Sequence, residues 1–250
     1  MAYKVLNNVS VKDVTSSDLL SLKTDLLVIV INKNTKDKVV NQLAKDVSSH
    51  LKESGSSVLV PNAKSFNAKN VLLVKGFQDS DQIHKLISMY QSIAQKGNQL
   101  KAKDISIMPG TVYPKGKCEM WLIEMVAKTI ESNVYIFSET CNKTAKKPSV
   151  KKLNILVSSL TKSDLIKAKN AAKKGYAIGE GVNSAKYLGD LPANHCTPRI
   201  IEKKVKAMTK DFPKLKVKSF NENQMKKIGM GSILSVSRGS EEPARMMIIQ

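Results

Sequence analysis

Cysteine is scarce in this chain, and the few cysteines form no pattern. The 250 residues include three, Cys118, Cys141 and Cys196, and none belongs to a Cys-x-x-Cys pair. An odd, scattered set argues against a disulfide framework and against a structural zinc site. We therefore expect reduced, buried thiols.

Long hydrophobic runs are missing as well. The most apolar stretch, residues 25–31, has six apolar residues after Asp25, whereas a membrane-spanning helix needs about 20. The first residues contain no apolar stretch of the ~7–15 residues that a secretory signal requires. With 12 glycines and 8 prolines the chain is not fibrous or of low complexity. These absences predict a globular, cytoplasmic protein with no membrane contact.

Arginine is rare although the chain is strongly basic. The formal net charge is +20, yet only Arg199, Arg238 and Arg245 among the 41 basic residues are arginines. Base recognition favours the arginine fork, so sequence-specific DNA reading is disfavoured. A solvated lysine surface is favoured over polyanion binding. The densest lysine cluster comprises Lys203, Lys204, Lys206, Lys210, Lys214, Lys216 and Lys218.

Short apolar segments alternate with amphipathic ones over the first 160 residues. Residues 25–31 are apolar without alternation, as in a parallel strand covered on both faces in the middle of a sheet. Other strands are predicted around Val5 and at 57–60, 70–74, 104–108, 134–137 and 153–157, and helices at 35–51, 80–97 and 118–131. This alternation predicts an α/β domain.

Residues 163–188 read as a helix crowded with small side chains. Gly175, Gly179 and Gly181 lie inside it, and each costs about 1 kcal/mol relative to alanine. Either another element approaches the helix closely or the helix breaks near Gly179. We expect close packing between two domains, with the domain junction in this helix.

The last third consists of short, well-signalled elements. Thr197 is placed to cap a helix over residues 199–210 with Pro198 in its first turn, and Asn221 with Gln224 resembles a capping box. That first helix is expected to bury Ile201, Val205 and Met208. Strands are predicted at 215–220, 233–237 and 246–250.

The histidines and cysteines give little indication of a metal site or a catalytic site. His50 and His84 lie beside apolar stripes of predicted helices, where a surface histidine is the expected role. The side chains of the adjacent His195 and Cys196 diverge in extended or turn backbone, so we expect neither a metal site nor a nucleophilic pair. No local signature of a catalytic cysteine surrounds Cys118 or the cysteine at 141.

Phosphate-binding loops are also lacking. No Gly-x-x-x-x-Gly-Lys-Ser/Thr sequence occurs, and the glycine pairs at 179–181 and 229–231 follow helices, where a dinucleotide fingerprint requires a strand. The residue types therefore assign no catalytic, cofactor-binding or metal-binding residue.

Two segments nevertheless match one family in the same order. Residues 177–198 read AIGEGVNSAKYLGDLPANHCTP, which resembles the small-x-Gly-x-x-x-Ala-Arg-x-Leu-x-Asn-x-Pro-x-Asn-x-x-Thr-Pro stretch that opens the peptidase domain of leucyl aminopeptidases, the cytosol aminopeptidase family. Residues 221–250 resemble that family's Leu-Gly-Met-Gly-x-Leu-Leu-x-Val-x-x-Gly-Ser-x-x-Pro-Pro-Arg-Leu segment. Residues 1–160 agree with the family's macro-like N-terminal domain in element order alone.

The resemblance implies an α/β architecture in three parts. These are a macro-like domain with a mixed sheet (1–160), a connecting helix (161–190), and the opening elements of an incomplete α/β zinc-peptidase-like domain (191–250). It also implies a cytoplasmic homohexamer that uses two divalent metal ions, manganese or zinc, to release N-terminal amino acids from peptides.

Several departures limit what the resemblance transfers. Lys186 and Asp190 stand where the family usually has Arg and Asn, and Ala244 replaces the second proline. The family's metal ligands and catalytic lysine lie in Gly-Lys-Gly-x-Thr-Asp/Phe-Asp-Ser-Gly-Gly and Asn-Thr-Asp-Ala-Glu-Gly-Arg segments, and neither occurs in residues 1–250. We therefore expect this chain alone to bind no metal and to be inactive, as the N-terminal portion of a longer enzyme.

Two other functions are weighed against this one. A lysine-rich module for nucleic acid or another polyanion would show steeply salt-dependent binding. A macro-type binder of ADP-ribose is disfavoured because residues 20–60 contain no glycine-rich phosphate loop.

Overall fold

The computed structural model describes residues 5–31, 51, 53–77, 83–110, 113–140, 147–158 and 160–250. The chain divides into two compact units, which we call the sheet unit (residues 4–183) and the C-terminal unit (residues 184–250). No helix in these described ranges is both long and apolar enough to span a membrane.

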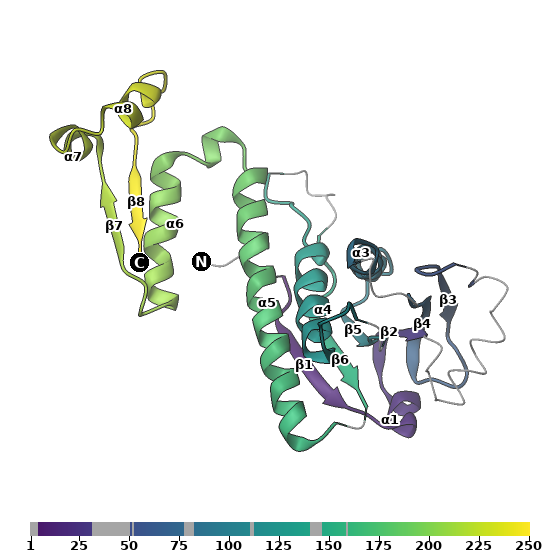
Figure 1. The fold of residues 1–250 in the computed structure, drawn as a ribbon. Coiled ribbons are helices and arrows are strands. Elements are labelled where there is room, and N and C mark those ends of the chain that lie inside the picture. Colours follow the sequence, from purple (N-terminus) through teal and green to yellow (C-terminus); the bar gives the residue numbers. More distant parts are fainter. Residues whose placement is uncertain are drawn as a thin grey trace. The chain divides into compact units, whose positions relative to one another are not determined.

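The described part of the sheet unit contains a sheet of six strands, most of which run parallel (Figure 1). They are β1 (Asn8–Asp13), β2 (Thr24–Ile31), β3 (Ser57–Pro61), β4 (Ala68–Lys75), β5 (Asp104–Met108) and β6 (Lys152–Val157). Their order is β1-β6-β5-β2-β4-β3, and β3 pairs antiparallel with β4 at one edge. The sheet is mixed, and β2 lies inside it between β5 and β4, as its continuous apolar sequence predicts.

Helices cover both faces of this sheet. They are α1 (Ser16–Ser21), α3 (Ile83–Gln99), α4 (Glu119–Val134) and α5 (Lys162–Asp190), the last of which continues into the C-terminal unit. Leu19 of α1 packs with Leu27 and Ile29 of β2 on one face. On the other face, α3 approaches Ile105, so that a Cβ added at Gly97 would lie 2.6 Å from the Ile105 Cδ1 atom.

A row of polar side chains crosses the sheet beside the apolar core. The Ser10 hydroxyl donates to the Asn154 side-chain oxygen (2.8 Å), and the Asn154 amide donates to the Ser106 hydroxyl (3.0 Å). Ser106 in turn donates to Thr24 (3.0 Å), whose hydroxyl donates to the Asp104 carboxylate. Ser10, Asn154 and Ser106 are register partners. A one-residue slip would break this row, so it specifies the pairing of β1, β6 and β5.

The C-terminal unit contains a long helix, a pair of strands that are distant in sequence, and two short helices. After the 3₁₀ helix η2 (Ala193–His195) come α6 (Pro198–Asp211), β7 (Val217–Phe220), α7 (Glu222–Lys227), α8 (Gly231–Ser237) and β8 (Met246–Ile249). β7 and β8 pair antiparallel. Thr197 caps α6 with Pro198 in the first turn, and Asn221 and Gln224 form both bonds of a capping box.

Four predicted elements differ from the structure or lie outside it. Residues 233–237 form α8 and not a strand, and α4 extends to Val134 where a strand was predicted. The first strand begins at Asn8, not around Val5. Residues 32–50, which include most of the predicted 35–51 helix, lie outside the described residues.

Burial in α6 is also weaker than predicted. Ile201, Val205 and Met208 are half-buried, and α6 has no fully buried residue. The described part of the C-terminal unit covers this face only partly, because only the short strands β7 and β8 and two one- to two-turn helices follow it.

Candidate functional site

The predicted histidine and cysteine positions do not converge. His84 on α3 and His195 in η2 are exposed. Cys118 is exposed and Cys196 half-buried, so the expectation of buried thiols is wrong for these two, while His50 and Cys141 lie outside the described residues. In the described part of the chain, no three His, Cys, Asp or Glu side chains are grouped so that they could hold a metal ion.

The small face of α5 packs against α4. A Cβ added at Gly175 would collide with the backbone carbonyl of Glu124, and one at Gly179 would lie 2.7 Å from the Glu131 Cβ. Helix α5 is continuous through both glycines, so close approach is the correct one of the two predicted alternatives. The partner is a helix of the same unit, however, not a second domain. Gly181 faces open space.

Close packing at Gly179 places a buried carboxylate under α5. The Glu131 side chain accepts the backbone N–H of Val5 at Oε1 (2.8 Å) and that of Leu6 at Oε2 (3.0 Å). The side-chain amide of Asn183 donates to the same Oε1 (2.9 Å). Glu131 and Asn183 are both fully buried. The Tyr176 hydroxyl adds a bond to the Leu6 carbonyl (2.8 Å), so α4, α5 and the segment before β1 meet at one point.

Burial has the largest effect on the pKa of the Glu131 carboxyl group. It raises the pKa of Glu131, and the negative charge of Glu180 acts in the same direction, while the hydrogen bonds from Val5, Leu6 and Asn183 lower the pKa. A carboxylate so enclosed serves as a structural acceptor and is not open to solvent or substrate. Sequence reasoning missed it, although an acidic residue on the apolar face of the predicted 118–131 helix was the available signal.

In the C-terminal unit, Glu202 of α6 joins the helix to the β7–β8 pair. Its carboxylate accepts Lys206 Nζ (2.6 Å), Ser219 Oγ (2.6 Å) and Arg245 Nε (2.8 Å). These bonds, led by that from Lys206, lower the pKa of Glu202 to about 2. Both Glu202 oxygens are therefore engaged by donors, which leaves this carboxylate unsuited to a metal ion.

One departure from the family pattern has a structural counterpart. The backbone N–H of Ala244 donates to Glu222 Oε1 (2.9 Å), which links α7 to the segment before β8. A proline at this position would lack that donor. Alanine at residue 244 thus permits a hydrogen bond that a proline would not form.

The lysine cluster is partly engaged within its own unit. Lys206 pairs with Glu202, the ammonium of Lys204 lies 4.5 Å from the centre of the Tyr187 ring, and that of Lys218 lies 4.9 Å from the centre of the Phe220 ring. Lys203, Lys210, Lys214 and Lys216 are exposed. The exposed members fit a solvated basic surface.

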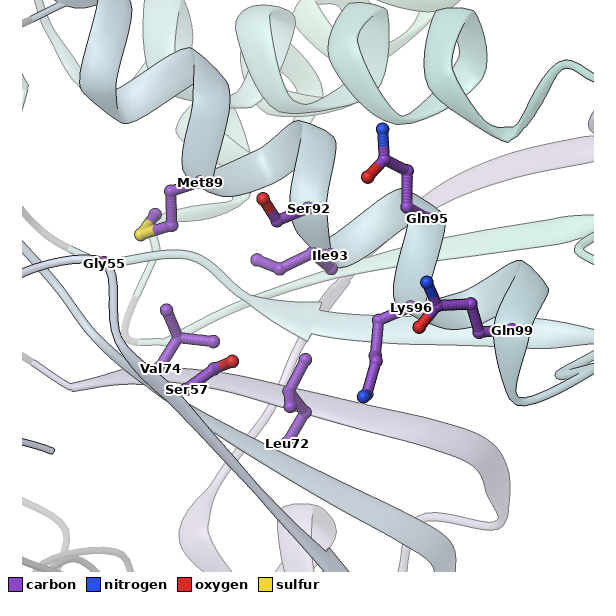
Figure 2. A pocket seen from close by; sticks show the side chains of 10 residues that line it. All are labelled: Gly55, Ser57, Leu72, Val74, Met89, Ser92, Ile93, Gln95, Lys96 and Gln99. Atoms are coloured by element: carbon purple, nitrogen blue, oxygen red, sulfur yellow. The ribbon is translucent and has the colours of Figure 1, made fainter. Parts of the chain in front are cut away.

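A pocket of about 210 Å³ opens in the sheet unit between α3 and the β3–β4 edge (Figure 2). Its lining combines apolar side chains with the ammonium group of Lys96 and several uncharged polar groups. Among the described residues that line it there is no histidine, cysteine or carboxylate.

The architecture defines a class of protein: an α/β chain with the fold of leucine aminopeptidases. A mutant of tomato leucine aminopeptidase superposes with a TM-score of 0.73 at 19% identity over 96% of this chain and 50% of that chain. The bottromycin maturation enzyme BotP in complex with manganese superposes with a TM-score of 0.69 at 16% identity, covering 90% and 45%.

Sequence comparison agrees with the fold. Residues 183–250 match the sequence model of the cytosol aminopeptidase family, catalytic domain. A probable cytosol aminopeptidase of Pseudomonas paraeruginosa is 30% identical over 200 residues, which are 78% of this chain and 39% of the relative. The cytosol aminopeptidase of Pseudomonas aeruginosa is 28% identical over 92% of this chain and 48% of its own length. The chain is thus related to the cytosol, or leucyl, aminopeptidases, and it spans about half the length of the curated relatives it matches.

Proposed function

We propose that this chain is the N-terminal part of a leucyl aminopeptidase, a metal-dependent hydrolase that releases N-terminal amino acids from peptides. The observation that carries the proposal is the match of residues 183–250 to the family's catalytic domain. The shared fold over 96% of the chain supports it.

In this proposal the parts have different tasks. Residues 1–160 form a macro-like scaffold domain, residues 161–190 connect it to the catalytic domain, and residues 191–250 are the opening elements of that domain. The contacts of Gly175, Gly179 and Glu131 with their neighbours support the scaffold role, because they hold α5 in one position on α4.

Two divalent metal ions, manganese or zinc, belong to the proposed complete enzyme. The described residues do not fit them, since Glu131 is enclosed by backbone N–H groups and Glu202 by Lys206 and Arg245. We therefore assign the metal ligands to family segments that residues 1–250 do not contain. No residue of this chain is given a role in the catalytic reaction. Peptide substrates, a homohexamer and a cytoplasmic location complete the proposal.

The alternative of nucleic-acid binding receives no support from the comparisons, which return aminopeptidases. The contacts of Lys204, Lys206 and Lys218 within their own unit give no reason to prefer it.

A chimeric enzyme tests the proposal. Residues 1–250 are joined to the C-terminal half of the P. aeruginosa cytosol aminopeptidase and assayed with leucine p-nitroanilide and Mn²⁺. We expect metal-dependent turnover by the chimera and none by the isolated C-terminal half. The proposal would be contradicted by a chimera that unfolds cooperatively, as followed by the fluorescence of Trp121, but shows no turnover at saturating metal.

A further inference from the structure

The pocket beside α3 takes part in none of the contacts that hold α4, α5 and the segment before β1 together. Its floor consists of four buried apolar side chains, Leu72 and Val74 of β4 and Met89 and Ile93 of α3. Figure 2 shows the helix residues on one side of the space and the strand residues on the other. At about 210 Å³ it is smaller than the ~300–1,000 Å³ typical of drug-sized ligands. Its size suits a small molecule.

Three small residues, Gly55, Ser57 and Ser92, are part of the pocket lining. Gly55 has φ +86°, and its N–H donates to the Lys75 carbonyl (2.7 Å), so the chain turns there in a conformation that suits glycine. Ser57 is the register partner of Val74. The Ser92 hydroxyl donates to its own helix, at the Ser88 carbonyl (3.0 Å), and does not fill the pocket. Helix α3 therefore leaves a gap above the β3–β4 edge.

Among the described residues that line the pocket, Lys96 is the one that carries a charge. Lys96 is half-buried, and its side chain reaches from α3 toward Leu72 of β4 (Figure 2). Within the described ranges of the chain, no carboxylate forms an ion pair with it. Gln99 adds a side-chain amide to the lining, whereas the amide of Gln95 points away from the strands (Figure 2). An ammonium beside an apolar floor gains most from a charged hydrogen-bond acceptor.

We propose that this pocket binds a small aliphatic carboxylate. The carboxylate accepts hydrogen bonds from Lys96 Nζ and from the side-chain amide of Gln99, and the hydrocarbon body lies against Leu72, Val74, Met89 and Ile93. An uncharged apolar molecule would desolvate the ammonium without compensation. A polyphosphate would meet one cation and leave the apolar floor without contact. This site is independent of the aminopeptidase proposal.

The test uses 4-methylpentanoate as the carboxylate and 4-methylpentanamide as its uncharged analogue. The full chain is labelled with ¹³C at its methionine methyl groups, and the Met89 signal is assigned by its loss in Met89→Leu. We expect 4-methylpentanoate to shift the Met89 signal saturably and to leave Met225, which is buried in the C-terminal unit, unchanged. The amide should bind about tenfold more weakly.

Matched variants locate the interaction. Lys96→Gln should weaken 4-methylpentanoate binding about tenfold, whereas Lys85→Gln, an exposed lysine of the same helix, should leave it unchanged. Ser92→Leu should fill the pocket and abolish binding, and Ser88→Leu, one turn away, should not. An unchanged Met225 signal shows that the C-terminal unit of each variant is intact. Cooperative unfolding in urea, followed by the fluorescence of Trp121, shows the same for the sheet unit. An unmoved Met89 signal, equal affinity for acid and amide, or equal effects of the two lysine variants would overturn the proposal.

Discussion

The side-chain amide of Asn183 donates to two acceptors of Glu131, the backbone carbonyl oxygen at 3.0 Å and the carboxylate at 2.9 Å. Both residues are fully buried. Asn183 is also the first residue of the match to the family's catalytic domain. The point at which that match begins is therefore fixed to α4 of the sheet unit by buried polar bonds, beside the close contact of Gly179.

Removal of the Asn183 amide should destabilise the sheet unit. Asn183→Ala leaves two buried acceptors of Glu131 short of a donor, and we expect a loss of about 1–3 kcal/mol in the free energy of unfolding. The chain's only tryptophan, Trp121, lies on α4, so urea unfolding followed by its fluorescence reports on this unit. Lys173→Ala, at an exposed position of α5, is the control and should have little effect. Equal midpoints for both variants would refute the role of Asn183.

Glu131 should give the sheet unit a characteristic pH dependence. Burial raises its pKa in the folded state above the unfolded value near 4.5. The folded chain then binds the proton more tightly, so the contribution of this group to stability is fully present below pH 4.5 and is lost as the pH rises through the raised pKa. Unfolding midpoints at Trp121 between about pH 4 and pH 8 should fall less steeply in Glu131→Gln than in wild type. Parallel curves would contradict this.

Glu202 should give the C-terminal unit a pH dependence of stability opposite to that expected from Glu131. Its folded pKa is lowered to about 2 from 4.5, so its contribution is present above pH 4.5 and is lost as the pH falls toward about 2. NMR cross-peaks of the paired Phe220 and Met246 report on the β7–β8 contact. The stability difference between wild type and Glu202→Gln should shrink on acidification. A difference that stays constant would show that the Glu202 bonds do not depend on its charge.

The glycines of α5 should respond to substitution according to what they face. Gly179→Leu presses on Glu131 and should cost roughly 1–3 kcal/mol through overpacking, and Gly175→Leu should cost at least as much because it meets the Glu124 backbone. Gly181→Ala, in open space on the same helix, should stabilise by up to about 1 kcal/mol. Thermal melts distinguish these results. Raised midpoints in all three variants would show that α5 does not lie against α4.

Apolar periodicity carried most of the fold prediction, and its errors fall on short segments. The continuous apolar residues of β2 predict an interior strand, which is confirmed. Residues 233–237 contain three apolar residues among five, but so short a segment does not distinguish strand from helix, and they form part of α8. In α4 the steps of four between Val126, Ile130 and Val134 continue the buried face, and these packing positions extend the helix to Val134.

The polar contacts were beyond reach of sequence patterns. Glu131 meets Val5 across 126 positions of the chain, and no local spacing encodes such a pair. Helix α1 could have been found, since Thr15 and Asp18 form a capping box three residues apart. The pocket could not be predicted from the sequence either. It forms where α3 lies beside β3 and β4, and the sequence pattern does not give the order of the strands.

The most direct test of the account is the assay of this 250-residue chain itself with leucine p-nitroanilide and added Mn²⁺ or Zn²⁺. The account holds that these residues provide the scaffold and the opening of a catalytic domain but no metal-ligating or catalytic side chain. It predicts no turnover above a blank that contains the metal alone. Turnover that rises with the concentration of the purified chain and vanishes with a chelator would contradict it.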